Sequence, residues 1–300
     1  MKKKRRGGYR VKRSGRKPGC VPAYGMYILS MLIFGTNGLL VARISLAASQ
    51  IVLLRTLLGG AALTALVLLH GGFDRAAVRA ELQPLLLGGA ALGANWVALF
   101  EAYRLLNVSL ATLIYYVGPM LILLLSPLLF REKLSGVKIA ALCLVAVGLV
   151  CISGSIAFGG MRLSGLLTAV VSALFYAALI AFNKRISRTS GLQTAAIELD
   201  AAFAVVLLYM LLTSGLPHPQ RGDLPYIAMI DLVNTGLAYF LYFSGLKKLP
   251  AQSVALLSYV DPVSALLFSA LLLNEALTPL QLSGAVLILG GAMLGELRRR

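Results

Sequence analysis

Runs of apolar residues that are long enough to cross a lipid bilayer fill nearly all of this 300-residue chain. A spanning α-helix needs about 20 consecutive apolar residues. Only 13% of the residues are charged, and the segments between the runs are short. The pattern leaves no room for a soluble domain and predicts an all-α polytopic membrane protein. Its ten expected transmembrane helices are 22–41, 46–70, 82–104, 108–130, 136–157, 163–184, 192–213, 224–247, 253–274 and 278–297.

The second half of the chain repeats the first. A shift of 143 residues aligns Tyr116-Val117-Gly118-Pro119 with Tyr259-Val260-Asp261-Pro262, and Glu132 with Glu275. A shift of 142 residues aligns Arg-Ile-Ser at 43–45 with Arg-Ile-Ser at 185–187. Each half holds five runs, an odd number, so the second half enters the membrane from the opposite side. We therefore expect two inverted five-helix repeats, 22–157 and 163–297, the architecture of secondary transporters.

The net charge of +17 is explained by where the basic residues stand along the chain. With the N-terminus inside, cytoplasmic segments hold 23 of the 28 lysines and arginines; four stand outside and Arg55 lies within a run. Such a bias is typical of membrane proteins, whose cytoplasmic loops are enriched in Lys and Arg. It predicts a multi-pass protein of the cytoplasmic membrane with both termini in the cytoplasm, and it gives no reason to expect nucleic acid as a partner.

The basic N-terminal tail, residues 1–21, is expected to be disordered. It combines ten basic residues with no acid and several glycines, a composition that cannot bury a core. Three interpretations stay open: a signal that fixes topology, a segment that binds anionic lipid headgroups, or a start of the chain placed before a true start at Met26.

Polar side chains inside apolar runs are candidate functional groups, because burying them in a membrane is costly. Asn37 would hydrogen-bond either a ligand or a neighbouring helix. Arg55 would form a structural ion pair, extend its head to the membrane surface, or bind substrate. Asn234 belongs to a polar and aromatic stripe that must face protein or a water-filled path. This stripe also includes Asp231, Thr235, Tyr239 and Tyr242.

Two aromatic residues occupy matching positions in the repeats. The 143-residue shift places Trp96 over Tyr239, so both could face one cavity. An aromatic belt at the membrane interface explains a single tryptophan equally well.

Asp261 is a charged residue near the middle of the ninth run. The adjacent Pro262 has no N–H for the carbonyl of Ser258, so a kink that frees this carbonyl is expected. The carboxylate, the carbonyl and the phenol of Tyr259 would then converge. An ionised Asp261 would bind an ammonium group, and a desolvated one would exchange protons. The alternative is a structural partner for Arg55.

No catalytic or metal-binding set can be assembled from three cysteines, two histidines and the available nucleophiles. A nucleotide-binding motif is also missing, so we expect no cofactor, no metal and no enzymatic activity, with transport driven by a gradient or by exchange.

The segments ATLIYYVGPMLILLLSPLLFREKLSG and AQSVALLSYVDPVSALLFSALLLNEALTPLQLSG, together with Arg55, resemble the drug/metabolite transporter superfamily, specifically the EamA-type permeases. The resemblance covers about residues 24–297. It implies that runs one to four and six to nine surround a cavity, while runs five and ten lie outside it. The candidate substrate-binding residues are Asn37, Arg55, Trp96, Tyr116, Asn234, Tyr239, Tyr259 and Asp261, and the candidate gating residues are Pro119 and Pro262.

Members of that family include exporters of amino acids and other metabolites. The favoured function is therefore a secondary transporter that moves a small polar metabolite, an amino acid or similar, outward by alternating access. A flippase for a lipid-linked substrate is the alternative, and it would need a cavity open sideways to the bilayer. A membrane-embedded enzyme is a distant third. The oligomeric state is left open, a homodimer included.

Overall fold

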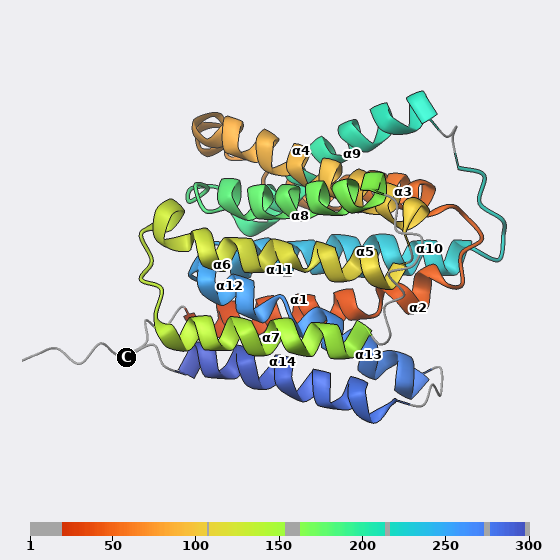
Figure 1. Cartoon of the computed structure of the whole chain (residues 1–300). Helices are drawn as coiled ribbons and strands as arrows, with labels where there is room; N and C mark the ends of the chain where they lie inside the picture. The colour runs from red at the N-terminus through yellow and green to blue at the C-terminus, as the bar shows by residue number, and fades with distance from the viewer. Residues whose placement is uncertain (1–19, 107, 154–162, 214–216, 273–276, 298–300) are drawn as a thin grey trace, which may run out of the picture.

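The computed structural model describes residues 20–106, 108–153, 163–213, 217–272 and 277–297, and all regular structure in these ranges is helical (Figure 1). The first half contains α1 (Cys20–Gly35), α2 (Asn37–Val41), α3 (Ala48–Leu69), α4 (Arg75–Leu105), α5 (Val108–Tyr115), α6 (Val117–Phe130) and α7 (Gly136–Ser153). The second half contains α8 (Leu163–Asn183), α9 (Gly191–Thr213), α10 (Leu224–Asp231), the π-helix η1 (Leu232–Leu237), α11 (Ala238–Leu246), α12 (Ala251–Leu257), α13 (Val260–Leu272) and α14 (Pro279–Leu297).

The expected spans are present as helices. Within the described ranges, nine segments are long and apolar enough to cross a membrane: Pro22–Val41, Ala48–Leu69, Leu82–Leu105, Leu110–Phe130, Leu163–Asn183, Gly191–Thr213, Leu224–Leu246, Ala251–Leu272 and Pro279–Glu296. The tenth, α7, is apolar and is described as far as Ser153. The all-α polytopic membrane fold is thus confirmed. The basic tail and Glu275 lie outside the described residues.

Several spans are interrupted near their middle. The break between α5 and α6 falls at Tyr116, and the break between α12 and α13 falls at Ser258 and Tyr259. Each lies a few residues before a proline, Pro119 or Pro262, because the proline ring removes the N–H that would continue the helix. The prediction of a free carbonyl at Ser258 is wrong, because the N–H of Asp261 donates a hydrogen bond to this carbonyl at 3.3 Å.

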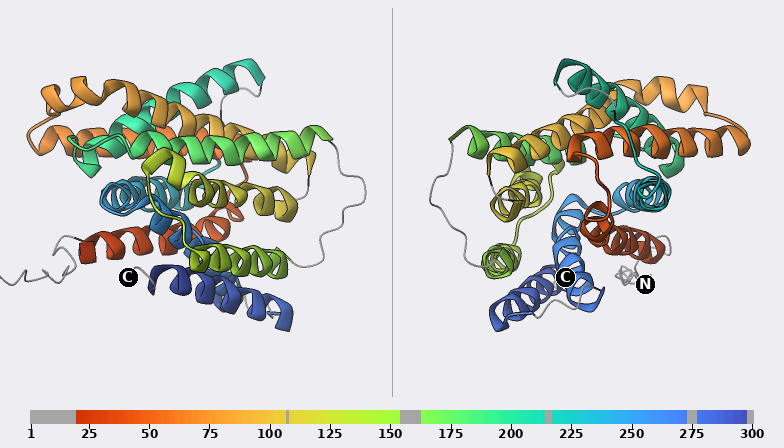
Figure 2. Two further views of the ribbon diagram at one scale, coloured as in Figure 1. Left: turned by 60° about the vertical axis from the view of Figure 1, so that its left-hand side comes forward. Right: turned by 90° about the vertical axis from the view of Figure 1, so that its right-hand side faces the viewer.

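The two halves interleave instead of folding side by side. Helix α4 of the first half packs against α8 and α9 of the second, and α1 packs against α11 and α13 (Figure 1). Helices α7 and α14 lie against each other at one edge of the bundle in both views (Figure 2). Glycines permit their close approach, because a Cβ on Gly284 would stand 2.7 Å from the carbonyl oxygen of Gly148. On their inner side, buried residues of both helices, such as Val145 and Ile288, join the core around Tyr116 and Tyr259.

The loops gather at two ends of the bundle, left and right in Figure 1. We call the left end, which holds the loops at 70–74, 131–135, 184–190 and 247–250, the basic end. The right end, which holds the loops at 42–47 and 217–223, is the opposite end. Helix α6 finishes at the basic end and α13 finishes toward the opposite end (Figure 1). The matched spans thus run in opposite directions, as inverted repeats require.

Candidate substrate site

Arg55 lies at the centre of the polar groups inside the bundle. Its side chain on α3 is only 7% exposed. The Nε atom donates to the Oγ1 atom of Thr235 in the π-helix at 2.9 Å, and the guanidinium carbon lies 5.1 Å from the Trp96 ring centroid. In the described residues Arg55 neither extends its head to the membrane surface nor makes an ion pair within 4 Å, because a buried hydroxyl and an aromatic face hold the cation inside. An ion pair is found elsewhere in the described residues: Arg104 lies 2.8 Å from Glu101.

Aromatic rings form one wall of this centre. Trp96 meets Tyr239 edge-on with ring centroids 5.6 Å apart, as their matching positions in the repeats suggested. Tyr239 also contacts Phe34 at 5.0 Å and Tyr242 at 5.8 Å. Such rings combine apolar surface with polar edges, and their faces attract cations. The contact between the two repeats is thus lined with groups suited to a small organic molecule.

Asp261 stands in the first turn of α13, directly after the interruption of its span. The hydroxyl of Tyr116 donates to its Oδ2 atom at 3.2 Å. The phenol of Tyr259 instead donates to the carbonyl of Tyr116 at 2.9 Å. The expected convergence of Tyr259 with Asp261 is therefore wrong, because side chains two positions apart on a helix do not face each other. The tyrosine of the other repeat takes that place.

Asn37 and Asn234 meet at the break between α1 and α2. The Nδ2 atom of Asn234 donates to the carbonyl of Ile33 at 2.9 Å, to Thr36 Oγ1 at 2.7 Å and to Asn37 Oδ1 at 3.1 Å. Asn37 was expected to hydrogen-bond either a ligand or a neighbouring helix, and in the structure it accepts a hydrogen bond from the neighbouring π-helix. The two amides join the interrupted first span to the π-helix of the eighth.

Asp231 is a further buried acid that the candidate list lacks. It is fully buried, and neither of its carboxylate oxygens has a hydrogen-bond partner among the described residues. Both Asp231 and Asp261 act electrostatically on Arg55. The sequence signal was present, since Asp231 is a lone acid within an apolar run just as Asp261 is. The sequence pattern places Asp231 only in the polar stripe of the eighth run and gives no separate sign of its burial.

The centre therefore carries one positive and two acidic groups without a direct ion pair among them in the described residues. A buried charge is costly unless an opposite charge or hydrogen bonds compensate it. With both acids ionised, the three groups sum to one negative charge. A proton or a cationic group of a ligand would neutralise the set, while Arg55 could accept an anionic group.

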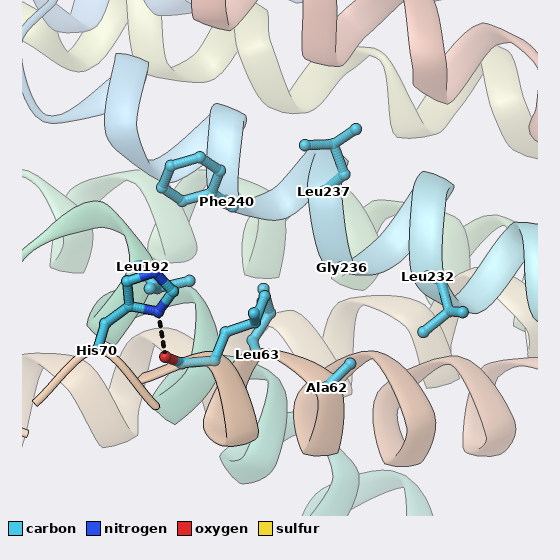
Figure 3. Close-up of a pocket in the computed structure, with 9 residues that line it drawn as sticks. Ala62, Leu63, His70, Leu192, Leu232, Gly236, Leu237 and Phe240 are labelled. Atoms are coloured by element: carbon cyan, nitrogen blue, oxygen red, sulfur yellow. Dashed lines mark hydrogen bonds between the residues drawn. The ribbon is translucent and has the colours of Figure 1, made fainter. Parts of the chain in front are cut away.

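A hollow faces outward between α3, α9 and the π-helix (Figure 3). It has a volume of about 450 Å³. Leu66, Leu232 and Leu237 on its rim are 42%, 52% and 45% exposed. Its one titratable side chain is His70, whose Nδ1 atom is 2.8 Å from the Leu66 carbonyl (Figure 3). The complete lining is Ala62, Leu63, Leu66, His70, Leu192, Leu232, Gly236, Leu237 and Phe240.

A bundle of apolar helices, interrupted around a buried polar centre and built from two inverted halves, defines a multi-pass membrane transporter. The chain matches the model of the EamA-like transporter family over residues 21–154 and 163–295, and it belongs to this family. It is accordingly a transporter and not an enzyme.

Several known proteins are similar to this chain in sequence. An uncharacterized transporter of Bacillus subtilis, YxxF, is 27% identical over 278 residues, which cover 91% of this chain and 89% of the relative. A probable amino-acid metabolite efflux pump of Salmonella typhimurium is 30% identical over 198 residues, which cover 61% and 65%. One crystal structure superimposes with a TM-score of 0.83 at 23% identity, covering 93% of this chain and 99% of that one, which shows a shared fold.

Proposed function

We propose that this transporter exports a small zwitterionic metabolite, an amino acid or a close relative, across the cytoplasmic membrane by alternating access. The observation that carries the proposal is a centre inside the bundle with both charge signs: the buried Arg55 and Asp231, and the half-buried Asp261, with both acids acting electrostatically on Arg55. An amino acid presents the complementary pair, a carboxylate and an ammonium. The similarity to a probable amino-acid metabolite efflux pump supports the same substrate class.

Each part of such a ligand has a partner in the centre. The guanidinium of Arg55 would bind the carboxylate in a charge-assisted contact. Asp261 would bind the ammonium, with Tyr116 holding the carboxylate of Asp261 in place through its hydroxyl. Trp96 and Tyr239 would contact the apolar part. In this arrangement Tyr259 supports Tyr116, while Asn37 and Asn234 hold the helix break beside the site.

The interrupted spans would supply the bends for alternating access. The α5–α6 and α12–α13 breaks lie in corresponding spans of the two repeats, and Pro119 and Pro262 keep them from closing into straight helices. Residues at element ends absorb the backbone changes of hinge motions. We assign gating to these two positions on that basis.

The outward hollow in Figure 3 gives no support to the flippase alternative. A lipid-linked substrate would need a lateral opening that also accepts a polar headgroup. The hollow is lined by aliphatic and aromatic side chains apart from His70, whose ring nitrogen is engaged by the Leu66 carbonyl. The polar centre remains the better substrate site.

The decisive experiment is counterflow in proteoliposomes that contain the purified protein and a panel of labelled metabolites. We expect exchange of zwitterionic amino acids, and weaker exchange of the matching amines and carboxylic acids, because each of these lacks one of the two charges. Exchange of anions or of uncharged solutes alone would reject the proposal. Liposomes with the Arg55→Gln protein provide the matched control.

The orientation proposed here puts the basic end and both termini in the cytoplasm, with the basic tail near anionic lipid headgroups. A single cysteine at exposed Ser135 should resist an impermeant thiol reagent added to intact cells, whereas one at exposed Gln220 should react. The native cysteines are replaced beforehand, and permeabilised cells serve as the control in which both sites react. Labelling of position 135 with position 220 silent would invert the topology.

A further inference from the structure

A buried carboxylate closes the basic end by reaching from one half of the chain to the other. Glu81 on α4 is 6% exposed, and it accepts from the backbone N–H groups of Ser187, Arg188 and Thr189 at 2.6, 2.8 and 2.9 Å. The hydroxyls of Ser187 and Thr189 add contacts at 3.2 and 3.1 Å. A first-half helix thereby holds the α8–α9 loop of the second half.

A second carboxylate makes the corresponding contact at the opposite end. Asp223, at the start of α10, is 5% exposed. It accepts from the N–H of Ser45 at 3.0 Å and from the Ser45 hydroxyl at 2.7 Å, and also from the N–H of Gln220 at 3.0 Å. Here a second-half helix holds the α2–α3 loop of the first half.

The two contacts are related by the internal repeat. A shift of 142 residues places Arg79-Ala80-Glu81-Leu82 over Arg221-Gly222-Asp223-Leu224. The same shift places Arg43-Ile44-Ser45 over Arg185-Ile186-Ser187. Both the carboxylate and its serine partner are therefore copied, and each copy binds across to the other half. A contact made by two repeated motifs at both ends points to a shared role and not to an accident of packing.

We propose that Glu81 and Asp223 are the positioning residues of the two gates. Both contacts are formed in the state described here, and release of either one would open its own end of the transporter while the other end stays closed. The proposal rests on the alternating access proposed above, but not on the identity of the substrate. We call the two contacts the Glu81 clamp and the Asp223 clamp.

The geometry explains why the clamps would open in turn. Each carboxylate directly precedes a corresponding span, Leu82–Leu105 or Leu224–Leu246, and the two spans enter from opposite ends (Figure 1). Rocking one half against the other would pull one carboxylate away from its loop and leave the second in place. Each direction of rocking thus releases one clamp and keeps the other.

The carboxylates are held in their charged form. Burial would raise the pKa of Glu81, but the N–H groups of Ser187, Thr189 and Arg188 outweigh it and lower the pKa to about 2. The hydroxyl and N–H of Ser45 likewise lower the pKa of Asp223. Near neutral pH the clamps are therefore released by movement and not by protonation.

The basic end carries two further contacts, one between the two halves of the chain and one within the second half. Glu132 accepts from the N–H groups of Ala251 and Gln252 at 2.7 and 3.1 Å. Lys247 donates to the Thr189 carbonyl at 2.7 Å, so it steadies the loop that Glu81 holds.

Cysteine accessibility tests the proposal without any substrate. In a protein whose native cysteines are alanine, one reporter replaces buried Ala195 near the Glu81 clamp, and another replaces buried Ile227 near the Asp223 clamp. Labelling rates with a hydrophilic maleimide are measured on purified protein in detergent. We expect Glu81→Gln to raise the rate at position 195 about fivefold and lower it at 227, and Asp223→Asn to do the reverse, a change typical of coupled sites.

The matched control is Asp74→Asn. Asp74 stands at the same end as Glu81 but caps its own helix, by accepting from Ala76 and Ala77, so both rates should stay unchanged. If either clamp variant fails to fold, Thr189→Ala and Ser45→Ala remove one hydroxyl donor each and should give the same opposite shifts. Clamp variants that raise both rates together, or alter neither, would overturn the proposal. A failed search for zwitterionic substrates would leave this outcome unaffected.

Discussion

Asp261→Asn should abolish most transport while the protein remains folded. Asparagine keeps the shape of the side chain but removes the charge that would bind an ammonium group. A hydrogen bond to a charged group contributes ~2 kcal/mol, which corresponds to about a 30-fold loss of apparent affinity. Substrate exchange in proteoliposomes measures the loss, and thermal unfolding in detergent tests whether the fold is intact.

The competing explanation makes Asp261 a permanent partner of Arg55. In that case thermal stability should fall with the Asp261→Asn change, and an added Arg55→Gln change should restore it. The structure favours recognition, because Arg55 bonds to Thr235 and Asp261 bonds to Tyr116. Asp200→Asn is the matched control, since this exposed acid on α9 bonds to Thr64 and should transport normally when changed. Full exchange activity in Asp261→Asn would end the assignment.

Glu81→Gln should lower stability by about 3 kcal/mol at neutral pH, and the difference should disappear in acid. Folding lowers the pKa of Glu81 from 4.5 to about 2, and each pKa unit corresponds to about 1.4 kcal/mol. Because the folded pKa is depressed, the contribution is fully present above pH 4.5 and is lost as the pH falls toward 2. Thermal unfolding of both proteins across pH 2 to 7 tests this.

The pH trend separates the clamp from simple packing. If Glu81 acted only by filling space, the wild type and the variant would differ by a constant amount at every pH. Asp74→Asn, at the same end, should show a smaller difference, because its carboxylate accepts only two backbone N–H groups of its own helix at 3.1 Å.

The membrane fold and its internal repeat can be predicted from the amino-acid pattern alone. The length of an apolar run shows whether it can cross a bilayer. A helix forms all of its backbone hydrogen bonds internally, so it needs only sufficient length and apolar side chains to span the membrane. The repeat then determined which residues correspond, and so it paired Trp96 with Tyr239 before any contact was known. Asp261 was found because an acid in an apolar run is costly wherever that run packs.

The partner that each polar group takes depends on how the helices pack in three dimensions. Tyr116 bonds to Asp261 across 145 residues, and Thr235 bonds to Arg55 across 180. Such pairings depend on how the halves interleave and where a helix breaks, and neither is encoded in a local pattern. The clamps are a second example. The repeated motifs around Glu81 and Asp223 are visible in the sequence, but the fact that each carboxylate binds a loop of the other half follows from how the inverted repeats pack.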